Sequence, residues 1–363
     1  MPQGDRIQTP TWTERMALFL FNQEALPDPI RLFLVGGLEL ASNWHQILFE
    51  SPVTTNSHIT RMIRLAQKPD SATFGATARP VAIVTGANTG CGYETTKGLL
   101  QAGYHVILAC RNPDITQKAI DRLKQETDLD HMEFMELDLA SLTSVAGFCN
   151  TFKAKGLPLH LLVNNAGIMM TPYARTAEGF ESQFGVNYVG HFVLTMKLVD
   201  VLKHSAPARI INLTSNAHLS TRSIDTKRLE DPKAYDPRVN YAISKLANLL
   251  FTAELSRRLE GTGVTVNAAH PGPVATELYR HLPAAHLVSA AVRYMFLTPA
   301  QGALTTLHLA LSPDVNGVSG MYFFNREPHR PSPAAENVEN QKALWEYTVD
   351  KLAAKFPEAK EWA

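Results

Sequence analysis

Short apolar runs alternate with amphipathic stretches throughout residues 80–330. The runs are rich in Val, Ile, Leu, Ala and Phe and are too short for buried helices, whereas apolar positions recur at helical spacing in the stretches between them. This alternation is typical of a parallel sheet with helices packed on both faces. The predicted strands are VAIVT (81–85), HVILAC (105–110), MEFMEL (132–137), LHLLVNN (159–165), RIINLT (209–214), VTVNAAH (264–270) and MYFFN (321–325).

The residues on either side of this region have a different pattern. Residues 1–79 hold two short apolar pieces and then a polar stretch, and residues 68–80 are typical of a linker. Neither piece has the roughly 20 apolar residues of a spanning helix, and the start lacks the basic and apolar regions of a signal peptide. We therefore expect an extension of amphipathic helices and linker over 1–79, one α/β domain over 80–330, and a C-terminal helical tail over 331–363.

Charge and cysteine content exclude several classes of protein. Lys plus Arg and Asp plus Glu each number 34, and the sequence pI is about 7.2. This balance predicts no basic surface for nucleic acid. Cys91, Cys110 and Cys149 form no CxxC pair, so we expect a reducing compartment, no disulfide framework and no metal site.

A glycine-rich turn follows the first predicted strand. The segment TGANTGCG (85–92) places Gly86, Gly90 and Gly92 between that strand and a helical pattern. In this context backbone N–H groups and a helix N-terminus bind the pyrophosphate of a dinucleotide, and small residues avoid a collision with the phosphates. The alternative is a plain tight turn, because a glycine pattern alone is weak evidence.

The end of the second predicted strand bears on the choice of cofactor. Its sequence LACRN (108–112) offers no carboxylate for the ribose 2′-hydroxyl of NAD(H), and Arg111 follows the strand directly. A guanidinium pairs well with a 2′-phosphate, so the sequence favours NADP(H) over NAD(H). The alternative is that Arg111 is a solvated surface charge.

Polar residues also follow the next predicted strands. Asp138 comes after the third strand, NNAG (164–167) ends the fourth, and Thr214 and Ser215 end the fifth. Ligands of a doubly wound sheet lie outside the carboxyl ends of its strands, so we expect these residues to converge on one crevice. Taken singly, each is more often a cap or turn residue.

Tyr241 and Lys245 are four residues apart at the start of a long predicted helix, 241–261, and therefore share one helix face. A phenol has an ordinary pKa near 10, and a neighbouring ammonium favours the phenolate. Such a phenol transfers a proton to or from a substrate oxygen near neutral pH, and Ser215 is placed to hydrogen-bond the same oxygen. The alternative is an accidental pair on an amphipathic helix, because the YxxxK spacing alone is weak.

Together these motifs resemble the short-chain dehydrogenase/reductase family, in the family's own order, over roughly residues 80–325. The segments TGANTGCG, ACRN, LDLAS, NNAGIMM, FGVNYVGHF, NLTSNAH, YAISKLAN and HPGPVATEL are most similar to its retinol dehydrogenase subgroup. That subgroup includes the WW-domain oxidoreductase and the X-chromosome-encoded member implicated in polyprenol metabolism. The resemblance implies a single Rossmann-like, doubly wound parallel sheet and an NADP-preferring alcohol dehydrogenase or carbonyl reductase.

The resemblance also implies a role for each candidate site residue. Tyr241 matches the catalytic acid/base, Lys245 the residue that lowers its pKa and holds the nicotinamide ribose, and Ser215 the serine that orients the carbonyl. Asn187 matches the asparagine that holds a relay water. The implied cofactor contacts are Gly86, Asn88, Gly90, Gly92, Arg111, Asp138, Asn165, Gly167, Tyr241, Lys245, Pro271, Gly272 and Thr276.

Two segments extend beyond the shortest family members. The polar insert 216–239 predicts a surface loop, and residues 1–79 are longer than the family core requires. Residues 277–296, where the family places its substrate lid, are rich in Leu, Ala, Val and Tyr and suit an apolar substrate; the alternative is a helix packed on the core. Met169 and Met170 are candidates to line the pocket or to fill the core.

The N-terminal extension bears on where the protein acts. Residues 29–49 combine Phe33, Trp44 and several leucines with few charges, which is typical of an interfacial helix. We favour peripheral membrane contact, on the cytoplasmic side of the endoplasmic reticulum or a lipid droplet, over docking against the protein's own domain or a partner subunit. The resemblance allows a homodimer formed through the helix that bears Tyr241 and its neighbour; the alternative is that the protein does not dimerise, because membrane-linked members of the family need not do so.

Three functions compete. The leading hypothesis is an NADP(H)-dependent oxidoreductase that interconverts an apolar alcohol of retinoid, prenol or steroid type and its aldehyde or ketone. The second is a non-catalytic binding or regulatory protein on a dinucleotide-bound scaffold, against which the complete set of catalytic residue types argues. The third is a nucleotide-sugar epimerase, which usually carries a TGxxGxxG spacing that the turn at residues 85–92 does not have.

Overall fold

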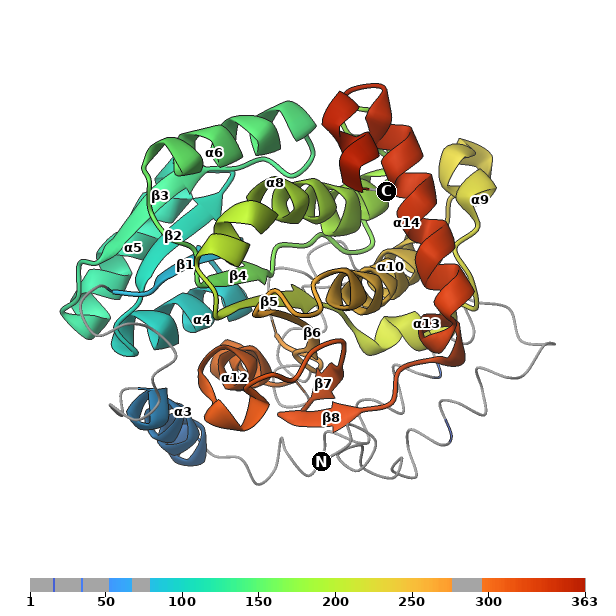
Figure 1. Ribbon diagram of the computed structural model, residues 1–363. Coiled ribbons are helices and arrows are strands. Elements are labelled where there is room, and N and C mark those ends of the chain that lie inside the picture. Colours follow the sequence, from blue (N-terminus) through green and yellow to red (C-terminus); the bar gives the residue numbers. More distant parts are fainter. Residues whose placement is uncertain (1–15, 17–33, 35–51, 67–78, 276–295, 363) are drawn as a thin grey trace.

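One eight-stranded sheet organises the protein (Figure 1). The computed structural model describes residues 16, 34, 52–66, 79–275 and 296–362. The strand order is β3-β2-β1-β4-β5-β6-β7-β8, with every neighbouring pair parallel except β7 and β8. The strands are β1 (Val81–Thr85), β2 (His105–Cys110), β3 (Met132–Glu136), β4 (Leu161–Asn164), β5 (Ala208–Leu213), β6 (Val264–His270), β7 (Tyr322–Phe324) and β8 (Glu327–His329).

Helices cover both faces of this sheet, as the sequence predicts for an α/β fold. Along β1, Ala82 and Val84 belong to one apolar cluster, whereas Val81 and Ile83 belong to the other. The first face packs against α4 (Gly90–Gln101), α5 (Pro113–Thr127) and α12 (Pro299–Leu311). The opposite face packs against α6 (Leu142–Ala154), α8 (Gly190–His204) and α10 (Pro237–Arg258).

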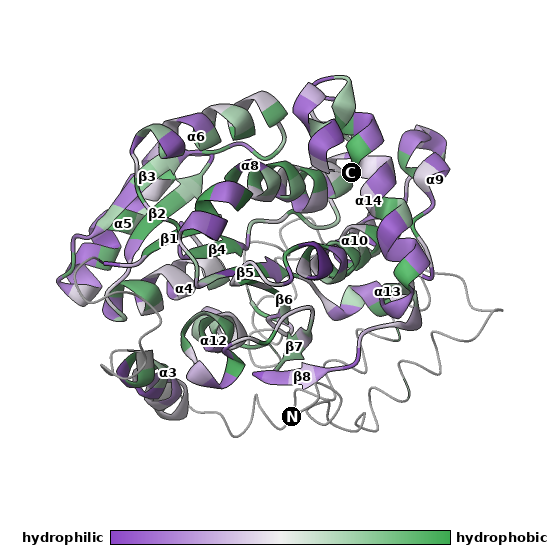
Figure 2. Ribbon diagram, viewed as in Figure 1, coloured by the Kyte–Doolittle hydropathy of each residue, from purple (hydrophilic) through white to green (hydrophobic). Residues whose placement is uncertain are grey.

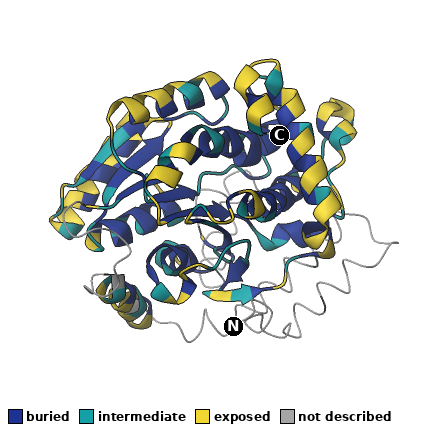
Figure 3. Cartoon of the chain, in the orientation of Figure 1, coloured by how far each residue is buried: buried dark blue, intermediate teal, exposed yellow. Residues whose placement is uncertain are grey.

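The distribution of apolar residues follows these layers. Hydrophobic residues gather on the central strands and on the helix sides that face them, with hydrophilic residues outside (Figure 2). The same central elements are buried, while α5, α6 and α14 (Val338–Ala353) expose their outer sides (Figure 3). The sheet is therefore the middle of a three-layer core, which holds the carboxyl ends of its strands in fixed relative positions.

The strand order reverses between β1 and β4, and this places the candidate site. β1 pairs with β2 on one side and with β4 on the other, so the chain leaves the two central strands towards opposite faces. A doubly wound sheet binds its ligand at such a reversal, outside the carboxyl ends of the strands. Thr85 ends β1 and Asn164 ends β4, so the glycine turn and NNAG begin side by side there.

Several element boundaries differ from those the sequence predicts. Helix α10 begins at Pro237, because the Asp236 carboxylate accepts hydrogen bonds from the amides of Arg238 and Val239. The insert 216–239 contains more structure than the expected surface loop. Its first residues form a largely buried 3₁₀ turn, η3 (Asn216–Ser220). The insert also contains α9 (Thr226–Glu230) and η4 (Pro232–Ala234), and its last three residues belong to α10.

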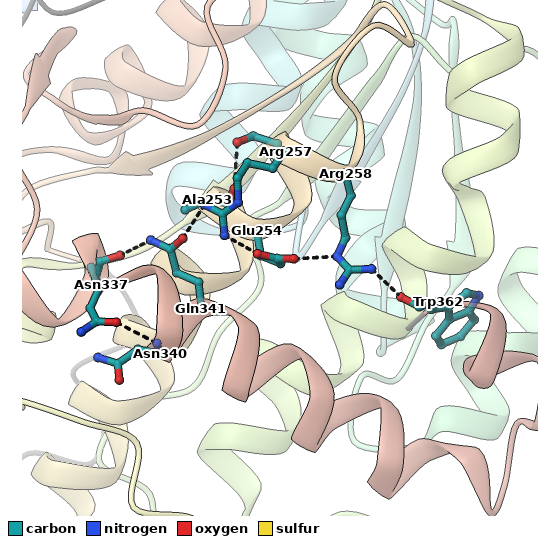
Figure 4. A network of polar contacts seen from close by, with 10 residues as sticks. Ala253, Glu254, Arg257, Arg258, Asn337, Asn340, Gln341 and Trp362 are labelled. Atoms are coloured by element: carbon teal, nitrogen blue, oxygen red, sulfur yellow. Dashed lines mark hydrogen bonds and ion pairs between the residues drawn. The ribbon is translucent and has the colours of Figure 1, made fainter.

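The C-terminal residues pack on α10. The predicted C-terminal helical tail, 331–363, contains two helices, α13 (Pro333–Glu336) and α14, followed by η7 (Pro357–Trp362). Trp345 of α14 is 1% exposed, and the Arg258 guanidinium lies 4.2 Å from its ring centre. Polar contacts extend this interface: Arg257 donates to Gln341 at 2.6 Å, and Arg258 donates to the carbonyl of Trp362 at 3.1 Å (Figure 4).

One N-terminal helix, α3 (Pro52–Ala66), packs against α12 and α4 and buries Met62. It starts within the Thr- and Ser-rich stretch that precedes the expected linker. No helix in the described part of the chain is both long enough and apolar enough to cross a membrane. Apart from Met16 and Leu34, the apolar N-terminal pieces and the predicted interfacial helix 29–49 lie outside the described residues. So does the predicted lid segment, apart from Phe296.

The remaining short elements belong to the loops around these layers. They are α7 (Ser182–Phe184), the π-helical turn η2 (Gly185–Val189) that leads into α8, and the 3₁₀ turn η6 (Pro313–Val315).

Candidate active site

The glycine turn after β1 has the shape of a phosphate cradle. Gly86 and Gly90 have φ values of 61° and 55°, which favour glycine. A β-carbon on Gly92 would lie 2.2 Å from the carbonyl oxygen of Gly86, so only glycine fits that position. The first amides of α4 start at Gly90 and lack helical partners, which makes them donors for an anion. The turn thus fits a dinucleotide pyrophosphate, and Asn88 beside it donates to the hydroxyl of Thr116 at 3.2 Å.

The NNAG segment joins this turn from β4. The Asn165 side-chain amide donates to the carbonyl oxygens of Thr85 at 2.7 Å and Gly86 at 3.3 Å. The backbone amides of Asn165 and Ala166 both donate to the Thr85 hydroxyl at 2.9 Å. The fourth strand therefore holds the glycine turn in place through side-chain and backbone contacts.

Gly167 lies where the cofactor floor meets the predicted catalytic residues. A β-carbon there would lie 3.3 Å from Oδ1 of Asn187 and 3.7 Å from Nζ of Lys245. Gly167 thus lies next to two predicted catalytic side chains, Asn187 from η2 and Lys245 from α10. The sequence predicts this convergence only through the family resemblance, since nearly 80 residues separate Gly167 from Lys245.

Lys245 is a buried cation. Its Nζ donates to the carbonyl oxygen of Leu213 at 3.1 Å and lies 5.7 Å from the centre of the Tyr241 ring. Burial lowers the pKa of this lysine from 10.5 to about 8, because the charged form loses its hydration. At pH 7 the site therefore holds a positive charge close to a phenol.

Tyr241 is surrounded by apolar side chains. It is 5% exposed and forms a small cluster with Met169, Ala217 and Ala242, with Met170 packed against it. Both methionines that follow the NNAG segment therefore lie beside Tyr241, where they either line a pocket or fill the core.

Ser215 and Asn187 are held by local hydrogen bonds. The Ser215 hydroxyl accepts from the amide of Ala217 at 3.2 Å and caps η3. The Asn187 amide is bound on both sides: Oδ1 accepts from the Ile168 amide at 2.8 Å, while Nδ2 donates to the Ile168 carbonyl and to the hydroxyl of Ser244, both at 2.9 Å. This arrangement fixes the orientation of the amide.

The other predicted cofactor residues occupy the outer parts of the same edge. Oδ1 of Asp138 accepts from the amide of Ala140 at 2.9 Å, and Arg111 is exposed directly after β2. Pro271 and Gly272 follow β6, where Gly272 has a φ of 79° and donates its amide to His270 at 3.4 Å. Thr276 lies outside the described residues.

Sequence reasoning missed three residues that hold these groups together. These are Thr85, His191 and Ser244, and all three are buried. The His191 ring contacts the Thr85 hydroxyl and the backbone carbonyl of Asn187, and the Ser244 hydroxyl donates to the backbone carbonyl of Tyr241. Each stands within a segment that carries the family resemblance, beside a residue singled out for catalysis or cofactor binding. Their position within these motifs could have indicated a role in the site. Several of their hydrogen-bond partners, however, are distant in sequence and become apparent only in the fold.

Comparison with known proteins confirms the resemblance. A family model described as short chain dehydrogenase matches residues 80–286. Retinol dehydrogenase 12 of Mus musculus is 41% identical over 276 residues, which are 76% of this chain and 87% of that protein. Polyprenol dehydrogenase of Homo sapiens is 41% identical over 273 residues, which are 73% of this chain and 82% of that protein.

Solved structures share the fold. An uncharacterised protein from Mycobacterium paratuberculosis has a TM-score of 0.60 at 33% identity, and the match covers 77% of this chain and 96% of that one. A candidate NAD(P)-dependent gluconate 5-dehydrogenase from Beutenbergia cavernae, with NADP bound at low occupancy, has a TM-score of 0.54 at 25% identity and covers 68% and 95%. The chain therefore belongs to the short-chain dehydrogenase family and is an oxidoreductase whose fold binds a nicotinamide dinucleotide, NAD(P).

Proposed function

We propose that the protein interconverts an apolar alcohol and its aldehyde or ketone, with NADP(H) as the preferred dinucleotide. The observation that carries this proposal is the buried Tyr241, which lies among apolar side chains 5.7 Å from the ammonium of Lys245. The relatives named retinol dehydrogenase and polyprenol dehydrogenase act, by name, on apolar alcohols of the same kind.

In this proposal Tyr241 transfers the proton of the substrate hydroxyl. Lys245 stabilises negative charge on the phenolate oxygen and binds the nicotinamide ribose, and Ser215 donates a hydrogen bond to the substrate oxygen. Asn187 holds a water that links Lys245 to solvent. A bound nicotinamide supplies or accepts the hydride.

The remaining proposed contacts are those with the dinucleotide. We assign the pyrophosphate to Gly86, Asn88, Gly90 and Gly92, because the turn is closely packed and leads into the N-terminus of α4, whose cap residue makes no side-chain hydrogen bond. Arg111 faces solvent and pairs with the 2′-phosphate, which sets the NADP preference. We assign the adenine side to Asp138, the floor to Asn165 and Gly167, and the nicotinamide amide to Pro271, Gly272 and Thr276.

We also propose a division of the chain and a location. Residues 80–330 form the catalytic domain, and 331–363 form a tail that packs on α10. Residues 1–79 form an extension that provides peripheral membrane contact and a linker, apart from α3, which packs on the domain. An apolar alcohol dissolves in membranes, and the three thiols are free, which suits the cytoplasmic side of the endoplasmic reticulum or a lipid droplet. A homodimer would have to use a face of α10 that α14 leaves open.

The test is oxidation of NADPH and of NADH by purified protein. The substrates are retinal, a prenyl aldehyde, a steroid ketone and an aliphatic aldehyde, with the Tyr241→Phe variant as the control. We expect turnover with NADPH and a loss of about 10³-fold in kcat for Tyr241→Phe, with dinucleotide binding retained. Tight NADPH binding without turnover of any substrate would instead favour the non-catalytic binding protein.

A further inference from the structure

His191 lies between the cofactor turn and the predicted catalytic Asn187, and one ring nitrogen contacts each of them. Nε2 is 2.9 Å from the hydroxyl oxygen of Thr85, and Nδ1 is 3.0 Å from the backbone carbonyl oxygen of Asn187, four residues earlier in the chain. The ring is 3% exposed, and neither contact is with solvent. The imidazole therefore joins the end of β1 to the π-helical turn η2.

The direction of these hydrogen bonds follows from the Asn187 end. A carbonyl oxygen only accepts, so Nδ1 of His191 carries a proton. Burial lowers the pKa of His191 to about 4, with the charge of Lys245 as a lesser cause, so the ring is neutral at pH 7. A neutral imidazole has one N–H, which leaves Nε2 as an acceptor for the Thr85 hydroxyl.

The Thr85 end gives the same assignment independently. The Thr85 oxygen already accepts two backbone amides, those of Asn165 and Ala166, each at 2.9 Å. Its single proton has two acceptors within reach, Nε2 of His191 at 2.9 Å and the carbonyl of Val163 at 3.4 Å. The shorter contact is the stronger one, so the hydroxyl donates to the imidazole.

Further hydrogen bonds lead from Asn187 towards the proposed acid/base. Nδ2 of Asn187 donates to the Ser244 hydroxyl at 2.9 Å, and that hydroxyl donates to the backbone carbonyl of Tyr241 at 2.7 Å. Hydrogen bonds thus link the cofactor turn through His191 to the backbone of Asn187, and the side chain of the same asparagine is linked through Ser244 to the first turn of α10. Thr85, His191, Asn187 and Ser244 are all essentially buried, so water does not compete for these bonds.

We propose that His191 is a positioning residue with two separable roles. In the first role, its Nδ1–H holds Asn187 and, through Ser244, Tyr241 in the catalytic arrangement. In the second role, its Nε2 holds the Thr85 hydroxyl and, through it, the floor on which the dinucleotide rests. The inference rests on the proposed function for the first role only, because the second concerns dinucleotide binding, which the family fold provides.

Two amide substitutions separate these roles. In His191→Asn the side-chain nitrogen takes the place of Nδ1, so the bond to Asn187 is kept and the bond to Thr85 is lost. In His191→Gln the side-chain oxygen takes the place of Nε2, so the bond to Thr85 is kept and the bond to Asn187 is lost. His191→Leu removes both. Tyr188→Phe is the matched control, because it removes a buried 2.8 Å contact with Thr348 from the same turn, outside this set.

The experiment measures kcat, the Kd of NADPH by fluorescence, and the melting temperature of the full chain. We expect His191→Gln to lower kcat about tenfold with the NADPH Kd within about twofold of wild type. We expect His191→Asn to raise the Kd about tenfold with kcat within about twofold. His191→Leu shows both effects, and Tyr188→Phe lowers the melting temperature alone.

The proposal would be wrong if His191→Asn and His191→Gln changed kcat and Kd equally and in proportion to their loss of thermal stability. His191 would then have only a structural role in the core. The binding measurement needs no substrate. If wild-type protein turned over no substrate, the proposed function would fail while the Kd comparison still decided the second role. A weaker Kd for His191→Asn than for His191→Gln supports that role, and equal values overturn it.

Discussion

The ammonium of Lys245 donates to the carbonyl oxygen of Leu213, the last residue of β5, at a distance of 3.1 Å. One hydrogen bond to a neutral oxygen replaces only part of the hydration that a cation loses on burial. Burial therefore places the charge of Lys245 beside Tyr241 but lowers the free energy of unfolding of the protein. Functional sites commonly show this conflict.

Replacing this lysine tests that conflict. Lys245→Met should raise the free energy of unfolding at pH 7 by about 2 kcal/mol and abolish turnover, because the cost of burying the ammonium exceeds the value of its hydrogen bond. Between pH 8 and pH 10.5 the unfolded chain keeps a proton at this lysine that the folded protein releases. The free energy of unfolding of the wild type therefore rises with pH in this window relative to that of Lys245→Met, and the stability advantage of the variant becomes smaller.

Urea denaturation at pH 7 and pH 10 measures both effects. Lys203→Met, at an exposed lysine of α8, is the control and should change little. A Lys245→Met protein that is less stable than wild type at pH 7 would contradict the argument.

We propose that the exposed Arg111 sets the choice of dinucleotide. Arg111→Ala should weaken NADPH binding about tenfold, the value of one charge-assisted hydrogen bond, and leave NADH binding nearly unchanged. Fluorescence titration of both dinucleotides measures the ratio. Lys118→Ala removes another exposed cation from α5 and should leave the ratio intact. An equal loss for both dinucleotides would mean that Arg111 does not contact the 2′-phosphate.

Two glycines in helices should respond in opposite ways to alanine. Gly92→Ala forces a β-carbon against the Gly86 carbonyl, so dinucleotide binding should fall below detection and the melting temperature should drop. Gly147→Ala, in α6, meets no atom within 4 Å and should stabilise the protein by about 0.5–1 kcal/mol through helix propensity. Isothermal titration and thermal denaturation of the pair give the comparison. A Gly92→Ala protein that binds NADPH normally would exclude the proposed cradle.

The C-terminal packing should contribute strongly to stability. Trp345→Ala is expected to cost about 3–5 kcal/mol, because it empties a buried site and removes the ring that Arg258 covers. Its exposed neighbour allows a control, Glu346→Ala, which should stay within about 0.5 kcal/mol of wild type. Chemical denaturation measures both variants. Equal stabilities would show that α14 docks only loosely.

Local sequence patterns predicted the sheet well, because each buried strand is a short apolar run. β1, β2 and β6 match the predicted ranges, and the alternation with helices indicated the fold class. β8 was missed because Glu327 and Pro328 lack a strand pattern and pair with β7 only through tertiary context. The buried turn η3 was missed for a similar reason, since His218 is polar in the sequence but is covered by Tyr322 and hydrogen-bonded to Ser332.

The candidate site was predicted from motif order rather than from contacts. Tyr241 and Lys245 share a helix face by spacing alone, and the glycine turn follows from its strand and helix. The approach of Gly167 to Asn187 and Lys245, and the role of His191 between them, depend on chain segments that the sheet brings together. Such long-range contacts have no local signal.

Helix α10 carries Tyr241 and Lys245 near one end, and α14 of the same chain packs against it through contacts at Phe251, Arg257 and Arg258, nearer the other end. A tethered segment reaches its docking surface at an effective concentration that a separate molecule rarely matches. Trp345 and Gln341 therefore occupy the surface that a second copy would need for packing along α10. We therefore expect the docking of α14 on α10 to be independent of protein concentration.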